Sequence, residues 1–156
     1  MRRAFLRIMA AGLASMVLAA CQPEPPPPPP PPTVVELTVA AAPTVNPAPD
    51  GRPSPVVVRV YELASPTTFN QADFLRLFND DQGTLGADML GRQELTLTPG
   101  SVQNVRRELR PEARFLGVVA AYRAYDQAVW RAVVPVPPNQ TTPLTADVGP
   151  LAVTLR

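Results

Sequence analysis

An unbroken run of eight prolines, from Pro25 to Pro32, limits what the chain can fold into. Proline lacks a backbone N–H and holds φ near −65°, so the run fits neither a helix nor the interior of a sheet. It adopts polyproline II instead, rising about 3.1 Å per residue and spanning roughly 25 Å. We therefore expect a semi-rigid stalk over residues 21–32 and a folded domain over residues 33–156. A proline-rich ligand for an aromatic groove is the alternative interpretation of the run.

Residues 1–20 have the pattern of a secretory signal peptide. Arg2, Arg3 and Arg7 form a basic start, and the apolar or small residues 8–20 that follow are fewer than the ~20 a membrane span needs. The segment ends in Leu18-Ala19-Ala20-Cys21, which resembles the bacterial lipobox, where the cysteine accepts a lipid and the chain is cut before it. Gln22, in place of an aspartate, favours sorting to the outer membrane. We expect Cys21 to be the lipidated N-terminus, since two or more acyl chains anchor stably.

The composition excludes much chemistry. The chain has no histidine and no lysine, and Cys21 is its one cysteine. Catalysis by Ser-His or Cys-His pairs is therefore excluded, as are Schiff-base mechanisms, structural zinc and a disulfide within the chain. A formal net charge of +1 gives no basic excess for nucleic acid. We expect no enzyme, no metal and no cofactor.

After the stalk, short apolar segments alternate with turn residues. Val35, Leu37, Val39 and Ala41 fall on one face of a first strand. The segment 115–122 is nearly all apolar and predicts a central strand, whereas Arg59 is expected on an outward face. The expected strands are residues 34–42, 56–63, 92–98, 102–109, 115–122, 128–136, 144–148 and 151–155. This spacing predicts an all-β sandwich or barrel.

One segment has a helical period instead. Asn70 can cap a helix over residues 71–79, with Asp73 in its first turn and Phe74, Leu77 and Phe78 on one face. A second turn is expected near residues 87–90. We expect the helix to form a lid over one edge of the sandwich, and a partner-binding helix is the alternative.

Two polar motifs have simple explanations. Residues 79–83 resemble a calcium loop, but position twelve is Leu90, so a turn after the helix is expected. Arg106 and Arg107 lie in one strand and point to opposite faces, where a solvated surface is expected.

The connection over residues 43–55 is a candidate recognition element. It is long compared with the usual 2–5 residues, and its five prolines stiffen it. Val45 is expected to supply apolar contact, with Asn46 and Asp50 fixing turns. A disordered insertion is the alternative. The candidate partner-binding residues are Thr44, Val45, Asn46, Pro47, Ala48, Pro49, Asp50, Gly51 and Arg52.

Several blocks, in order and spacing, resemble a known family. They are Val57 to Leu63, Phe69, Ala72-Asp73-Phe74, Leu77, Leu85 to Asp88, Pro99-Gly100, Phe115 to Arg123 and Trp130-Arg131. With the lipobox in front, the chain resembles the type VI secretion system lipoproteins of the TssJ (SciN/VasD) family over about residues 34–136.

The resemblance implies a transthyretin-like β-sandwich with a short added helical segment, anchored in the outer membrane and facing the periplasm. It implies a role in recruiting and anchoring the periplasmic C-terminal domain of the inner-membrane protein TssM, and through it TssL. The family's main TssM contact, the loop between the first two strands, maps by position and not by motif to residues 44–52. The alternative is a generic periplasm-facing β-sandwich lipoprotein that binds carbohydrate or another assembly partner.

Overall fold

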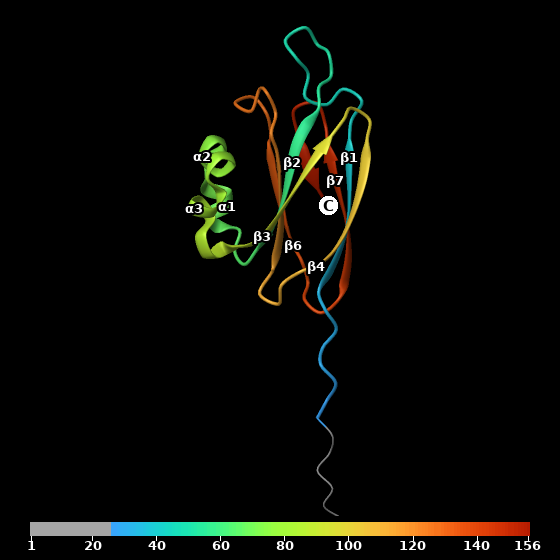
Figure 1. Ribbon diagram of the computed structural model, residues 1–156, viewed down its shortest axis with the longest axis vertical. Helices are drawn as coiled ribbons and strands as arrows, with labels where there is room; N and C mark the ends of the chain where they lie inside the picture. The colour runs from blue at the N-terminus through green and yellow to red at the C-terminus, as the bar shows by residue number, and fades with distance from the viewer. Residues whose placement is uncertain (1–25) are drawn as a thin grey trace, which may run out of the picture.

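The structure is a computed structural model that describes residues 26–156. The expected signal peptide and Cys21 lie outside these residues. Prolines 26–32 are exposed, belong to no helix or strand, and extend away from one end of the domain (Figure 1). Within the described residues, no helix is both long and apolar enough to cross a membrane.

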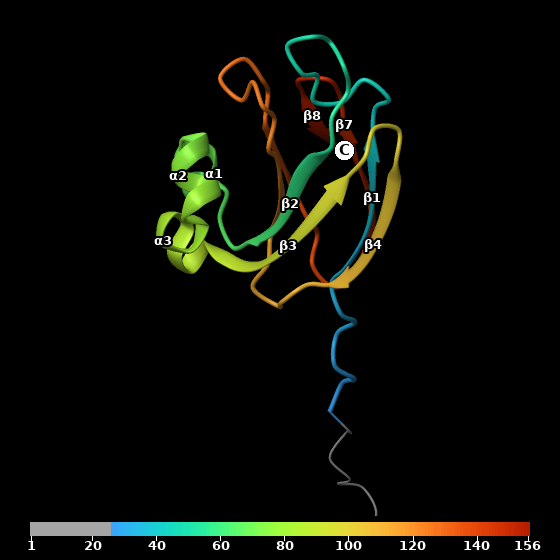
Figure 2. The same ribbon diagram turned by 45° about the horizontal axis from the view of Figure 1, so that its top comes forward.

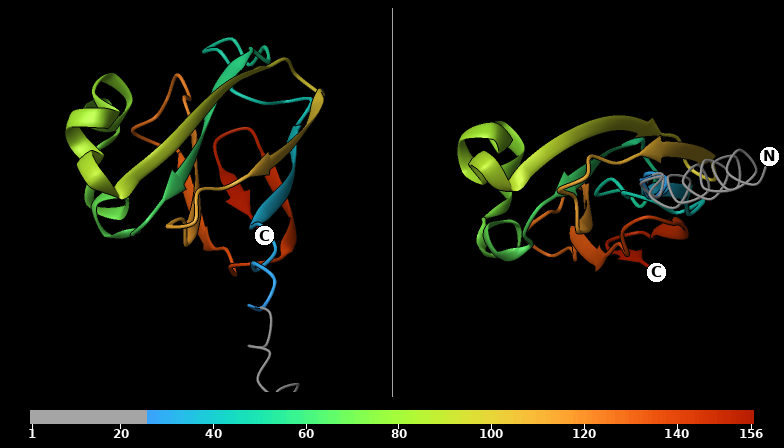
Figure 3. Two further views of the ribbon diagram at one scale, coloured as in Figure 1. Left: turned by 60° about the horizontal axis from the view of Figure 1, so that its bottom comes forward. Right: turned by 90° about the horizontal axis from the view of Figure 1, so that it is seen from below.

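Two four-stranded sheets form a sandwich to which short helices are added, so the expected all-β sandwich is confirmed as a mostly-β sandwich (Figures 1 and 3). The first sheet has the order β4-β1-β7-β8 and the second the order β3-β2-β5-β6. The strands are β1 Val34–Ala41, β2 Val56–Leu63, β3 Met89–Leu97, β4 Val102–Glu108, β5 Phe115–Ala120, β6 Arg131–Pro135, β7 Thr141–Val148 and β8 Val153–Leu155. As predicted, β5 is central, because it pairs with β2 and β6.

Alternating side chains of both sheets fill the space between them. Val35, Leu37, Val39 and Ala41 are all buried, as their spacing predicts. β1 pairs antiparallel with β4 and parallel with β7, so it is an inner strand of the first sheet. An isolated parallel bridge between Val129 and Ala152 joins the two sheets near β6 and β8. The core is therefore a continuous layer between the sheets.

Arg107 corrects one expectation. Arg106 and Arg107 do point to opposite faces, but only Arg106 lies on the solvated surface, where its Nε donates to Glu36 at 3.1 Å. Arg107 points between the sheets and forms an ion pair with Glu62, which is only 3% exposed. The alternation of side chains along a strand predicts the two directions. It does not predict that Arg107 meets the buried carboxylate of Glu62.

The helical segment consists of several short helices rather than one over residues 71–79. These are α1 Thr67–Gln71, α2 Phe74–Asn79, α3 Asp81–Leu85 and the 3-10 helix η1 Gly86–Asp88. Asn70 lies inside α1, and the side chain that caps α2 belongs to Asp73, which accepts from the backbone N–H of Arg76 at 2.9 Å. Asp80 caps α3 by accepting from the Gly83 N–H, so the expected turn is a link between helices.

This helical segment covers the outer face of the second sheet, not an edge of the sandwich (Figure 2). Phe69 is fully buried and lies so close over Gly117 that a Cβ there would approach its ring to 2.9 Å. Tyr61, Leu63 and Val119 complete a second apolar cluster beneath the helices. A glycine at position 117 is therefore what lets the helical segment approach the sheet.

A partly buried ionic network fastens the same segment. Asp81 of α3 is 7% exposed and accepts from Tyr61 Oη at 3.2 Å and from Arg92 at 2.5 Å. The Arg59 guanidinium lies 3.6 Å from Asp81 and donates to the Phe78 carbonyl at 2.6 Å. Arg59 does point away from the core between the sheets, as expected, but the helical segment covers it and leaves its side chain only 13% exposed.

Candidate functional site

The connection between β1 and β2 has a buried root and an exposed tip. Val45, Asn46 and Ser54 are buried, and the Ser54 N–H donates to the Val45 carbonyl at 3.1 Å. This bond closes the neck of the loop. The residues above it, 49–53, are exposed. The loop is thus an ordered extension of the sandwich.

Asn46 ties the root to neighbouring segments. It adopts a positive φ of 48°, a conformation that asparagine tolerates better than most residues. Its Nδ2 donates to the Pro55 carbonyl at 2.8 Å, and its Oδ1 accepts from the Arg123 N–H at 2.8 Å. Its own N–H donates to the Pro150 carbonyl at 3.1 Å. These bonds use both ends of the amide, so Asn46 fixes the direction in which the loop leaves the core.

The tip is a closed turn. The Ala48 N–H donates to the Arg52 carbonyl and the Gly51 N–H to the Ala48 carbonyl, both at 2.8 Å. Gly51 has a φ of 81°, where other side chains are strained. The Asp50 carboxylate accepts from the Arg52 backbone N–H at 3.1 Å and from its Nε at 2.6 Å, and these bonds, with the nearby Arg123, lower the Asp50 pKa. The tip therefore holds its shape with its charges internally balanced.

The loop and the stalk lie at opposite ends of the domain (Figure 1). β1 runs from one to the other, since the stalk leads into Val34 and the loop leaves after Ala41. The stalk end is secured at Thr33, whose carbonyl accepts from the Leu109 N–H and whose Oγ1 accepts from the Asn139 N–H, both at 2.9 Å. The loop therefore projects from the end farthest from the stalk.

Two other connections flank the loop at that end, as Figure 2 shows. A depression of about 430 Å³ lies between the β1–β2 loop, the β5–β6 connection and the β7–β8 turn. It is lined by Pro47, Ala48 and Pro49 on one side and by Arg123, Ala124, Asp126 and Leu151 on the other.

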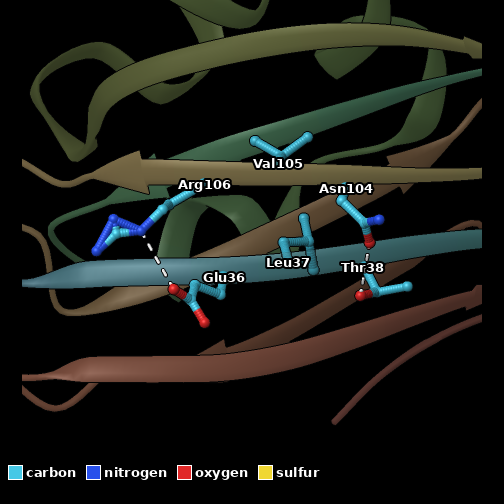
Figure 4. Close-up of a pocket in the computed structure, with 6 residues that line it drawn as sticks. All are labelled: Glu36, Leu37, Thr38, Asn104, Val105 and Arg106. Atoms are coloured by element: carbon cyan, nitrogen blue, oxygen red, sulfur yellow. Dashed lines mark hydrogen bonds and ion pairs between the residues drawn. The ribbon is translucent and has the colours of Figure 1, made fainter.

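The outer face of the first sheet offers a weaker site. Figure 4 shows a hollow between β1 and β4 in which Arg106 donates to Glu36 and Thr38 donates to Asn104 at 3.0 Å. These groups satisfy each other, so the hollow resembles an ordinary solvated sheet face. Among residues 26–156, no group of three or more carboxylates gathers into a metal site.

Most of the predicted site residues lie together, but two of them, Val45 and Asn46, are buried. Thr44 and the residues of the tip form a single projection, but Val45 is 0% exposed and packs in the main core, so it cannot supply contact to a partner. It is buried because the neck of the loop closes beneath the tip. Sequence reasoning missed Arg123, Ala124 and Leu151, which lie 70 or more positions along the chain from the loop. No local pattern marks them.

Comparisons with known proteins agree on one family. Residues 33–151 match the family model of the type VI secretion lipoproteins, described by the names VasD, EvfM and TssJ. The chain is similar to the T6SS lipoprotein TssJ1 from Pseudomonas aeruginosa, with 40% identity, a TM-score of 0.78, and coverage of 81% of this chain and 96% of that one. A comparison with curated proteins finds no match.

Two further solved structures are similar. One chain, from a structure described as a type VI membrane complex, has 31% identity and a TM-score of 0.71, covering 80% of this chain and 98% of that one. Another, from a structure described as the T6SS protein TssM C-terminal domain from EAEC, has 28% identity and a TM-score of 0.68, with the same coverages of 80% and 98%. The chain thus belongs to the type VI secretion lipoprotein family of VasD, EvfM and TssJ, and it is a membrane lipoprotein of that secretion system, not an enzyme.

Proposed function

We propose that this lipoprotein anchors the type VI membrane complex to the outer membrane by binding the periplasmic C-terminal domain of TssM. The proposal includes a signal peptide over residues 1–20, a lipid on Cys21 and a stalk over residues 21–32. The tip of the β1–β2 loop is the proposed contact, and TssL is joined indirectly through TssM. The similarity to chains from the membrane-complex and TssM C-terminal-domain structures supports this partner.

The observation that carries the proposal is the placement of stalk and loop at opposite ends of β1. A domain tethered at its stalk end presents the far end to the periplasm. The ordered tip is already closed by its own hydrogen bonds, so binding costs little conformational entropy. The strand order of the two sheets further supports a transthyretin-like sandwich with an added helical segment between β2 and β3.

The buried root dictates how the loop is tested. Replacing all of residues 44–52 would remove Val45 from the core, so the informative variant exchanges only residues 48–52 for a Gly-Ser linker. We expect this tip variant to melt within about 2 °C of the wild type, since exposed positions rarely affect stability. Its affinity for the TssM C-terminal domain should fall at least about tenfold, as expected when central contacts are lost.

A matched control is available at the stalk end. Pro137 and Pro138 lie in the connection between β6 and β7, and exchanging them for Gly-Ser alters another proline-containing loop at the opposite end. We expect no change in TssM affinity. Wild-type affinity in the folded tip variant would move the contact elsewhere, with the surface of the helical segment as the next candidate.

The anchor has its own test. Mass spectrometry of the membrane-extracted protein should find an acylated Cys21 at the N-terminus. An intact Met1 terminus, or a soluble Cys21→Ser protein that still supports secretion, would contradict the lipid anchor.

A further inference from the structure

We infer that the partner binds a platform built from three connections at the far end of the sandwich, and that Asn46 is the positioning residue that holds this platform together. The inference rests on the proposed function, because it assigns a larger surface to the same partner. The three connections are the β1–β2 loop, the β5–β6 connection and the β7–β8 turn.

The first observation is that hydrogen bonds made by two buried residues join all three connections. Through Asn46, which is 3% exposed, the β1–β2 loop accepts from Arg123 of the β5–β6 connection and donates to Pro150 of the β7–β8 turn. Tyr122, 2% exposed, donates through its hydroxyl to the Gly149 carbonyl at 3.1 Å, and this joins the other two connections to each other. Each connection is therefore bonded to both of the others.

A second observation fixes the far side of the platform. The Val129 N–H donates to the Leu151 carbonyl at 2.9 Å, and the Val153 N–H donates to the Val129 carbonyl at 2.8 Å. The β5–β6 connection is thereby paired with the β7–β8 turn along its backbone. Connections bonded in this way move together, so the surface above them is preformed for binding.

The third observation is the character of the depression between the connections. Its walls are largely apolar, from Pro47, Ala48, Pro49 and Leu151, while the exposed Arg123 and Asp126 lie among them. A volume of about 430 Å³ open to solvent suits side chains of a docked protein. The surface fits a segment that inserts an apolar side chain and places polar groups of both signs near Arg123 and Asp126.

The occupant we assign is the TssM C-terminal domain, because the depression is continuous with the proposed contact. Pro47, Ala48 and Pro49 belong to the β1–β2 loop and also form one wall of the depression. A partner that grips the tip therefore covers the depression as well. The opposite wall then contributes contacts from residues far from the loop in sequence.

The surface arm of the experiment uses Leu151→Ala and Arg123→Ala, which change the opposite wall and leave the loop intact. Affinity of the mature lipoprotein in detergent for the TssM C-terminal domain is measured beside the tip variant. We expect each substitution to weaken binding about fivefold to tenfold with no loss of secondary structure. If both bind as the wild type does while the tip variant fails, the platform is overturned and the proposed function stands. If the tip variant also binds normally, the proposed site itself fails, and the platform with it.

The positioning arm uses Asn46→Gly, which keeps the positive φ accessible but removes both side-chain hydrogen bonds. The matched control is Asn139→Gly, because Asn139 also has a positive φ, 60°, and lies at the stalk end. We expect Asn46→Gly to bind the TssM C-terminal domain about tenfold more weakly than the wild type. The control should bind with unchanged affinity, both being measured at a temperature where they are fully folded. Asn46→Asp keeps the acceptor for the Arg123 N–H, so it should recover part of the affinity. A lower melting temperature with unchanged affinity would show that Asn46 is only structural.

Discussion

The sandwich has one bare outer face and one covered outer face. On the first sheet, β1 and β4 present Glu36, Thr38 and Arg106, which bond to their neighbours across the strands and face solvent. On the second sheet, β2 presents Tyr61 and Leu63, which the helical segment buries. The difference teaches that a strand with one wet face alternates in sequence, whereas a strand covered on both faces is mostly apolar and pairs the charges it carries, as β2 does with Arg59 and Glu62.

The largest expected effect comes from opening the covered face. Phe69→Ala removes a fully buried ring that packs 5.8 Å from the Tyr61 ring, centroid to centroid. We expect a loss of about 3–5 kcal/mol in the free energy of unfolding, measured by denaturant titration.

Thr38→Ala on the bare face is the control for that substitution. It removes an exposed hydrogen bond to Asn104, so the change should stay within about 0.5 kcal/mol. If Phe69→Ala costs no more than Thr38→Ala, the helices do not cover the sheet as described.

Raising the pH is expected to have an intermediate effect on stability, through Tyr61 on the covered face. Burial raises the pKa of Tyr61 to about 12 from an ordinary value of 10.0. Between these values the unfolded chain releases the phenolic proton and the folded protein keeps it, so the free energy of unfolding falls as pH rises. We expect a loss on the order of 1–2 kcal/mol across this window.

The Tyr61→Phe variant isolates this contribution. It starts less stable because the hydrogen bond to Asp81 is lost, but its decline between pH 10 and pH 12 should be shallower than that of the wild type. The free energy of unfolding of both proteins is measured by urea titration at several pH values in this range. An equal decline with pH in the two proteins would contradict the role of Tyr61.

The smallest effect is expected from the ion pair on the bare face. Glu36→Gln breaks a bond to Arg106 between two exposed side chains, and such pairs contribute about 0–1 kcal/mol. We expect a change within about 0.5 kcal/mol that shrinks further in high salt, measured by thermal unfolding at two salt concentrations. A cost above about 2 kcal/mol would show that this face is not simply solvated.

Much of the fold could be predicted because strand periodicity is local. The alternation from Val35 to Ala41 and the apolar run in β5 each predict a strand and its environment. The helix boundaries were predicted wrongly because Asn70 and Asp73 are both capable caps, and the structure uses Asp73. We attribute that choice to Phe69 of α1, because it packs over Gly117, which belongs to a strand distant in sequence.

The candidate site was predictable only in part for the same reason. Loop length and proline content identify the β1–β2 connection, but nothing near Val45 in sequence indicates that the neck of the loop closes at this residue. The residues of the opposite wall of the depression are positioned by β5, β6 and β7. No sequence pattern indicates that the Pro150 carbonyl or the Arg123 N–H will bond to Asn46, because such backbone groups occur all along the chain. Backbone partners of this kind appear only once the strands are placed.

The position of β1 between the stalk and the β1–β2 loop has a mechanical consequence. If the membrane anchor pulls at Val34 and the bound partner pulls beyond Ala41, tension runs along this one strand. β1 is paired on both sides, with β4 through seven residue pairs and with β7 through eight. Because these hydrogen bonds lie across the direction of pull, they are sheared together instead of being unzipped one after another. The same strand that positions the loop would then resist extraction when the anchor and the partner are pulled apart.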